Sequence, residues 1–198
     1  MIGYSDRINH ALAFAAKHHD REVRKGTRPP YLTQPANVAL ILTRYGRDDD
    51  TVVAGILLDL VEDCLRQGWS REMLDERVGV KFGAAVLETT LAVTRRRVDD
   101  EGIELSRDEV RSDLLARLAG ASEAGRWICA ADLVHQAGTL LADLRRTIDR
   151  DNVWGRLAGG RASTVRWFGD VRDRFAELGF TAPIAMELAD LVTALERA

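Results

Sequence analysis

The feature that most constrains this chain is an apolar segment, residues 49–64, that carries three carboxylates in its second half. Residues 52–61 are hydrophobic at nearly every position, which predicts a helix buried on most of its surface. Asp59, Glu62 and Asp63 are spaced i, i+3 and i+4, so a helix stacks them along one side. A buried carboxylate is costly unless it is paired, hydrogen-bonded or bound to a metal. The segment therefore predicts a core helix with a polar stripe that requires partners.

The remainder of the chain also predicts helices, because apolar residues recur at helical spacing and no alternating strand pattern occurs. The predicted connections are polar or rich in glycine and proline, and they cover residues 24–32, 95–105 and 148–162. We therefore expect an all-α fold, a single domain over residues 1–198 with about eight to nine helices. The predicted helices are 5–19, 35–45, 49–64, 70–77, 83–93, 122–146, 163–178 and 183–197, the last capped by Thr181. A further helix is predicted to begin at the capping box of Ser106 and Glu109.

Composition excludes several classes of function. The 198 residues are 46% hydrophobic and 30% charged, as in globular proteins in water, and the net charge of −3 offers no basic field for nucleic acid or anionic lipid. No apolar run approaches the roughly 20 residues needed to span a bilayer, and no signal peptide opens the chain, so we expect a cytoplasmic protein. Cys64 and Cys129 do not have a metal-finger or redox spacing and are expected to be core thiols. The oligomeric state stays open.

A series of short motifs occurs along the chain in a fixed order. The motifs are Ala13-Phe-Ala-Ala-Lys-His-His19, Arg24-Lys-Gly-Thr27, Pro30-Tyr31, Gln34-Pro35, Leu58-Asp59, Glu62-Asp63, Phe82-Gly83, Val93-Thr94 and Ala130-Ala-Asp-Leu-Val-His-Gln136. This succession resembles the HD-domain hydrolases of the RelA/SpoT type, including the small alarmone hydrolases, and the resemblance covers roughly residues 5–175.

The resemblance implies an activity and a ligand set. Proteins of this type remove the 3′-pyrophosphate from (p)ppGpp with one Mn²⁺, which is held by a His before a Pro, a His-Asp doublet and a later Asp. A Glu-Asp pair after the doublet supports the attacking water, and it corresponds here to the candidate catalytic residues Glu62 and Asp63. The positions of the metal ligands are Gln34, Leu58-Asp59 and Asp132 in this chain.

Two of these four ligand positions are replaced. Leu58 has no donor atom, and Gln34 offers a carbonyl oxygen, a weaker ligand than the imidazole that transition metals prefer. Asp59, Asp132 and Gln34 are the candidate metal ligands, and together they suit at most a loosely held, hydrated cation. We therefore expect either no metal or a weakly bound Mn²⁺ or Mg²⁺.

The residues that match the family's substrate-binding positions are better preserved. Arg24, Lys25, Tyr31 and Arg97 occupy positions that contact the phosphates or the base in the family, and Gln136 replaces a family Asn. Guanidinium groups suit polyphosphates because they form bidentate hydrogen bonds. The implied ligand is a guanine nucleotide of the (p)ppGpp kind. For the arginine-rich runs, a solvated surface loop is the alternative.

The chain's histidines have ordinary interpretations at this stage. His19 matches a family His ahead of the Arg-Lys loop and is expected to be a hydrogen-bonded core residue, whereas His10 and His18 are expected on the surface. His135 shares a helix face with Asp132, and a lone His there is more often structural than a metal ligand.

Three functions stay open. The first, which we favour, is a catalytically impaired hydrolase fold that binds at most a guanine nucleotide or a protein partner. It follows from the replacements at positions 34, 58 and 136 and from Cys129, which stands where the resembled family usually has a lysine. The second is an active phosphohydrolase with a metal site rebuilt from the remaining carboxylates. The third is a helical interaction module with no nucleotide role, its pocket closed by Leu58 and its carboxylates paired with arginines.

Overall fold

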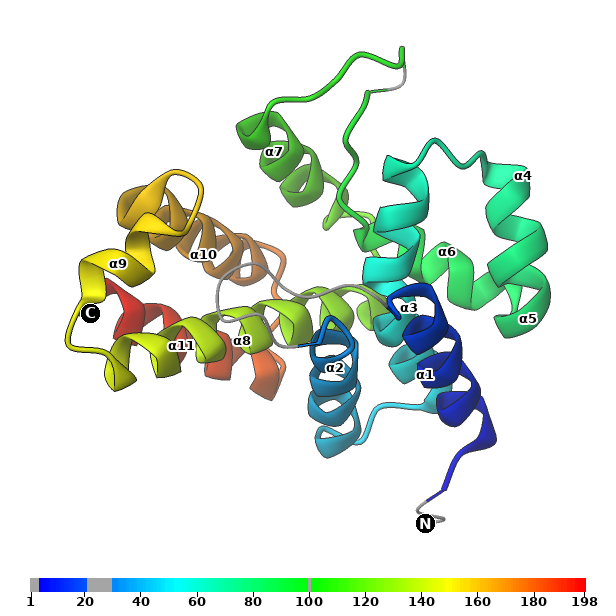
Figure 1. The fold of residues 1–198 in the computed structure, drawn as a ribbon, viewed down its shortest axis with the longest axis horizontal. Helices are drawn as coiled ribbons and strands as arrows, with labels where there is room; N and C mark the ends of the chain where they lie inside the picture. Colours follow the sequence, from blue (N-terminus) through cyan, green and yellow to red (C-terminus); the bar gives the residue numbers. More distant parts are fainter. Residues whose placement is uncertain (1–3, 21–29, 100) are drawn as a thin grey trace. The chain divides into compact units, whose positions relative to one another are not determined.

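The computed structural model describes residues 4–20, 30–99 and 101–198, and these residues confirm the all-α fold (Figure 1). An isolated bridge joins Val98 and Glu104, and no strand forms in the described ranges. The helices are α1 (Asp6–His18), α2 (Thr33–Arg44), α3 (Asp49–Arg66), α4 (Arg71–Leu74), a π-helical turn (Asp75–Gly79), α5 (Val80–Phe82), α6 (Ala84–Val93), α7 (Arg107–Arg117), α8 (Glu123–Arg146), α9 (Arg150–Gly155), α10 (Gly160–Glu177) and α11 (Pro183–Glu196).

The chain divides into two compact units, Met1–Cys129 and Ala130–Ala198, and α8 passes from one to the other. Each unit is described separately below. A single domain over residues 1–198 stays a prediction.

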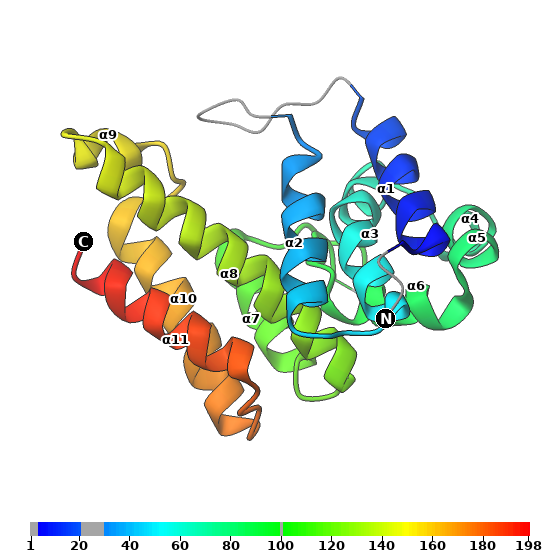
Figure 2. The same cartoon turned by 90° about the horizontal axis from the view of Figure 1, so that it is seen from below.

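The acid-bearing helix α3 is the centre of the first unit, and α1, α2 and α6 pack against it (Figure 2). Residues 51–61 of α3 are all buried, as their hydrophobicity predicts. Helix α2 approaches closely because position 55 is a glycine: a Cβ there would lie 2.7 Å from Leu42 Cδ1 and 3.1 Å from Val38 Cγ1. This close approach brings the start of α2 to the middle of α3.

Most helix starts agree with the capping residues found in the sequence. The Ser5 side chain accepts a hydrogen bond from the backbone N–H of Ile8, and Ser106 and Glu109 form the predicted capping box at the start of α7. For the acid-bearing helix the sequence allows a start at Asp49 or Asp50, and α3 begins at Asp49 with Asp48 as its cap. Helix α2 begins at Thr33, two residues before the expected Pro35.

Two predicted segments differ from the structure. The region 148–162 was expected to be a connection, but it contains α9, because Asp149 accepts a hydrogen bond from the Asn152 N–H and caps a short helix. The predicted helix 70–77 is longer and continues through the π-helical turn into α5. In addition, α11 begins after Ala182 without a side-chain cap, so Thr181 does not cap it.

The second unit is built around the pair α10 and α11, which lie side by side in both views (Figure 2). Their facing sides are fully buried and hydrophobic, and they include Val171, Phe175, Leu188, Val192 and Leu195. None of the helices in the described ranges is both long and apolar enough to cross a membrane.

Candidate functional site

The candidate site in the first unit is the carboxylate stripe of α3 together with the residues that contact it. Asp59 and Asp63 are buried, with 5% and 3% of their surface exposed, and Glu62 is half-buried. Burial of three acids within five residues requires compensation for each charge. The structure provides a different kind of partner for each of them.

Asp59 is paired with the side-chain amide of Gln34. The Nε2 group of Gln34 donates a hydrogen bond to Asp59 Oδ1 at 3.3 Å, and both side chains are buried. The structure thus brings together two of the predicted metal ligands, but through the N–H end of the amide. That end is a donor, whereas a metal ligand must present a lone pair. Leu58, which precedes Asp59, is 4% exposed and contributes only hydrocarbon.

Glu62 is held by Arg95, from the segment that follows α6. The Arg95 backbone N–H and its Nε both donate to Glu62 Oε1, at 2.9 Å and 2.8 Å, and Nε also lies 3.1 Å from Oε2. Sequence reasoning missed Arg95 and chose Arg97 as the basic residue of this segment. Arg97 is exposed, and its backbone carbonyl accepts a hydrogen bond from Leu105. The sequence signal that could have identified Arg95 is its place directly after the Val93-Thr94 motif.

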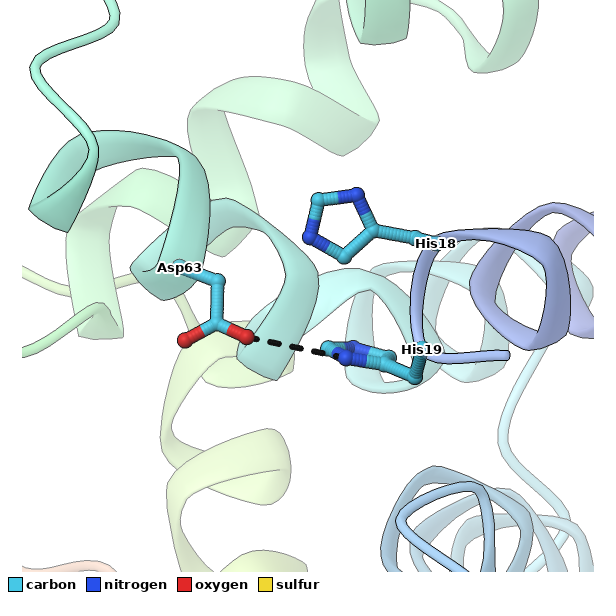
Figure 3. A group of neighbouring side chains, drawn as sticks. All are labelled: His18, His19 and Asp63. Atoms are coloured by element: carbon cyan, nitrogen blue, oxygen red, sulfur yellow. Dashed lines mark ion pairs between the residues drawn. The ribbon is translucent and has the colours of Figure 1, made fainter. Parts of the chain in front are cut away.

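Asp63 contacts the C-terminal end of α1 (Figure 3). Its Oδ2 lies 3.6 Å from His19 Nδ1, and its Oδ1 accepts a hydrogen bond from Arg66. His19 is buried, as the sequence predicts. His18 is half-buried instead of lying on the surface, and its ring meets the His19 ring edge-on with centroids 4.7 Å apart. His10 is exposed, as predicted.

Tyr31 covers this part of the site. Its ring stacks on His19 with centroids 4.4 Å apart and an angle of 26° between the planes. Burial raises the pKa of the Tyr31 hydroxyl above its usual value, and the negative charges of Asp59, Asp63 and Glu62 raise it further. The hydroxyl stays protonated at neutral pH, as in an ordinary tyrosine, and can donate a hydrogen bond. Its role at a phosphate-binding site stays a prediction.

The second unit contains the remaining two predicted site residues. Gln136 Nε2 donates to Asp132 Oδ2 at 2.6 Å, one helical turn apart on α8, and Asp132 is buried with 6% exposure. This pair repeats the arrangement of Gln34 and Asp59: a side-chain amide donates to the carboxylate that matches a family metal ligand. The predicted core thiols Cys64 and Cys129, both in the first unit, are buried. Arg24 and Lys25 lie outside the described residues, so their roles stay predictions.

Comparison with protein families gives a match over most of the chain. The model of the HD domain matches residues 11–147. The chain belongs to the HD-domain family. It is also related to enzymes of (p)ppGpp metabolism, among them the guanosine-3′,5′-bis(diphosphate) 3′-pyrophosphohydrolase of Aquifex aeolicus, with 33% identity over 46% of this chain. The GTP pyrophosphokinase rsh of Brucella melitensis is 27% identical over 87% of this chain.

These relatives are much longer proteins. The matched regions span 12% of the Aquifex protein and 22% of the Brucella protein. Among solved structures, a metazoan orthologue of SpoT that hydrolyses ppGpp has a TM-score of 0.70 and 23% identity, with 96% of both chains covered. The protein lmo0812 of Listeria monocytogenes has a TM-score of 0.67 and 22% identity, covering 83% of this chain and 99% of that one. Both structures support the fold.

The HD-domain family is metal-dependent, and the residues at the family metal position determine whether this chain can hold the ion there. A divalent transition metal requires imidazole or carboxylate lone pairs directed at one point. At this position Leu58 has none, and the Gln34 amide directs a donor hydrogen at Asp59. The residues of the first unit therefore do not fit the family's ion at that position.

Proposed function

We propose that this chain is a RelA/SpoT-type HD-domain protein that has lost pyrophosphate hydrolysis and retains, at most, binding of a guanine nucleotide or a protein partner. The observation that carries the proposal is the hydrogen bond from Gln34 to Asp59 beside the buried Leu58. An amide that donates to this carboxylate provides the stabilisation that a cation would otherwise provide. The buried charge at Oδ1 of Asp59 is thereby compensated in part without an ion.

The Gln136–Asp132 pair supports the same conclusion independently. In a hydrolase of this type, a metal generates the attacking hydroxide and stabilises charge on the phosphate oxygens. Because Asp59 and Asp132 each accept a hydrogen bond from an amide, neither is left to hold the metal that would generate hydroxide or stabilise the phosphate. The ion pair between Glu62 and Arg95 also engages the acid that would support the attacking water.

Nucleotide binding is supported by the parts of the site that do not depend on metal. Tyr31 is kept protonated beside the carboxylate stripe. Arg24 and Lys25 match the positions that contact phosphate in the resembled family, and basic side chains of this kind bind a pyrophosphate by charge-assisted hydrogen bonds. The proposed ligand is therefore a guanine nucleotide bearing a 3′-pyrophosphate, as the names of the relatives also suggest.

The test combines turnover with binding. The purified chain is incubated with ppGpp and Mn²⁺, and released pyrophosphate is measured. We expect no release above the protein-free rate, together with a rise in melting temperature on adding ppGpp. A ligand at a hundredfold excess over its Kd stabilises the folded state by about 2.7 kcal/mol, which is readily detected. Manganese-dependent turnover that disappears in Asp59→Asn would instead support the rebuilt carboxylate site.

A restoration experiment tests the reason for the loss. In the double variant Gln34→His, Leu58→His, both replaced positions again carry imidazole beside Asp59, so we expect Mn²⁺ binding at the Asp59 position that the parent lacks and that Asp59→Asn abolishes. The single variant Leu58→His is the matched control, because Gln34 still donates to Asp59 and the gain should be smaller. If neither ppGpp nor GDP shifts the melting temperature of any variant, the interaction module without a nucleotide role is the better assignment.

A further inference from the structure

The C-terminal end of α1 and the C-terminal half of α3 place two imidazoles and one carboxylate around a common point. The potential ligand atoms of His18, His19 and Asp63 all lie within 4.8 Å of one another (Figure 3). The cluster is well shielded from water, since the side chains of His19 and Asp63 are only 1% and 4% exposed and His18 is half-buried. These residues are not among the ligands of the family position.

The closest pair in the cluster already has a separation suited to coordination. In a tetrahedral site with metal–ligand bonds of about 2.0–2.2 Å, neighbouring ligand atoms are roughly 3.3–3.5 Å apart. His19 Nδ1 and Asp63 Oδ2 are 3.6 Å apart, so both can bind one ion after a small movement. His18 is the last residue of α1 and its ring lies edge-on to that of His19, so a side-chain rotation can bring its nitrogen closer.

The surroundings favour a cation at this point. Asp63 Oδ2 is buried and accepts no hydrogen bond from any part of the chain that the structure describes; its contact there is the ion pair with His19. Tyr31 stacks on the His19 ring and fixes its plane, which is the role that outer-shell residues have around metal-bound imidazoles. The carboxylate of Asp59 on the same helix side adds negative charge nearby, whereas Arg66 is bound to the other oxygen of Asp63 and leaves Oδ2 to face the imidazoles.

We propose that His18, His19 and Asp63 form a binding site for a divalent transition-metal ion such as Zn²⁺, with water completing the coordination. Two imidazoles and one carboxylate are a donor set that Zn²⁺ accepts with an open fourth position. The site lies one helical turn, about 6 Å, along α3 from the family position at Asp59. It binds the ion through imidazoles that the family position of this chain no longer has. The proposal goes beyond the proposed function and does not depend on a nucleotide.

The test is a titration of the full-length chain, first treated with EDTA and then dialysed, with Zn²⁺ alone. We expect one equivalent to bind, and His18→Ala to weaken binding by about 100-fold or more, because loss of a ligand costs at least as much as loss of an outer-shell partner. His10→Ala is the matched control, since this histidine lies on the same helix and is exposed. The control should bind as the parent does.

A second measurement identifies the ligands directly. Co²⁺ replaces Zn²⁺ in such sites, and its visible absorption reports four-coordinate nitrogen and oxygen ligation. We expect this absorption in the parent and in His10→Ala, and its loss in His18→Ala and Asp63→Asn, with circular dichroism confirming that each variant is folded. The proposal is overturned if no stoichiometric Zn²⁺ binds, if His18→Ala binds like the parent, or if only Asp59→Asn abolishes binding. None of these results bears on ppGpp binding, because the ppGpp-induced rise in melting temperature is measured on the metal-free chain.

Discussion

The Gln34–Asp59 pair gives the sharpest prediction, because the two partners should respond differently to substitution. In Gln34→Leu the buried carboxylate of Asp59 loses a charge-assisted donor, and a hydrogen bond to a charged group is worth about 1.5–3 kcal/mol. We therefore expect a loss of about 2 kcal/mol in the free energy of unfolding. For a chain of this size, 1 kcal/mol corresponds to roughly 2–4 °C in melting temperature, so the expected decrease is about 4–8 °C.

The partner variant Asp59→Asn should cost much less. The Asn oxygen still accepts from Gln34, and a neutral amide does not carry the desolvation cost of a buried carboxylate, so we expect a change within about 1 kcal/mol. Urea unfolding of both single variants and of the double variant gives the coupling between the two positions. Gln67→Leu, at an exposed position after α3, is the control and should change stability by less than about 0.5 kcal/mol. The reasoning is refuted if Asp59→Asn is the more damaging change, because Asp59 would then have a cationic partner that it needs.

Three further predictions concern the first unit. Gly55→Ala should destabilise the chain by about 1 kcal/mol in urea unfolding, since the clash with Leu42 at 2.7 Å outweighs the gain in helix propensity; greater stability would contradict it. Burial would raise the pKa of Asp113, but hydrogen bonds from Arg96 and Arg117 lower it. The ionised carboxylate therefore contributes about 1–2 kcal/mol to the free energy of unfolding above pH ~4, and this contribution is lost as the pH falls through the lowered pKa. The stability difference between the parent and Asp113→Asn should therefore shrink as the pH falls from about 4 through the lowered pKa, and a difference that stays constant over this range would refute this. Burial raises the pKa of Cys64 to about 11, so this thiol should react with a thiol reagent at pH 8 only after unfolding.

The helices could be predicted because their ends are determined locally. Ser5, Asp48 and Ser106 each cap the first turn through their own side chain, so a few neighbouring residues suffice to place the helix start. Helix α9 was missed for a related reason: its cap, Asp149, lies within a glycine-rich stretch that predicts a connection. The burial of α3 was predictable from its composition alone.

The partners within the site could be predicted only in part. The resemblance selected Gln34, Asp59, Glu62 and Asp63; the three acids lie on the helix expected to carry them, and Gln34 lies on α2 because that helix begins two residues before the expected Pro35. It could not show which end of the Gln34 amide faces Asp59, because that depends on side-chain rotation after α2 has packed on α3. The His18 position was misjudged because the end of α1 turns its ring toward His19, an effect of tertiary packing that helical spacing does not describe.

The persistence of three buried acids in a helix without the family's ligands has a physical explanation in the way their charges are distributed. Asp59 accepts from a neutral amide, Glu62 is neutralised by Arg95, and Asp63 contacts His19 and Arg66. Each carboxylate is stabilised by its own partner, so no common cation is required to hold the stripe together. A single hydrated ion near Asp59 would have to displace the Gln34 hydrogen bond while gaining no imidazole from position 58. An ion beside Asp63 gains two imidazoles and leaves both the Gln34–Asp59 and Arg95–Glu62 pairs intact, which is why the structure favours a transition-metal ion there over a magnesium ion at the family position.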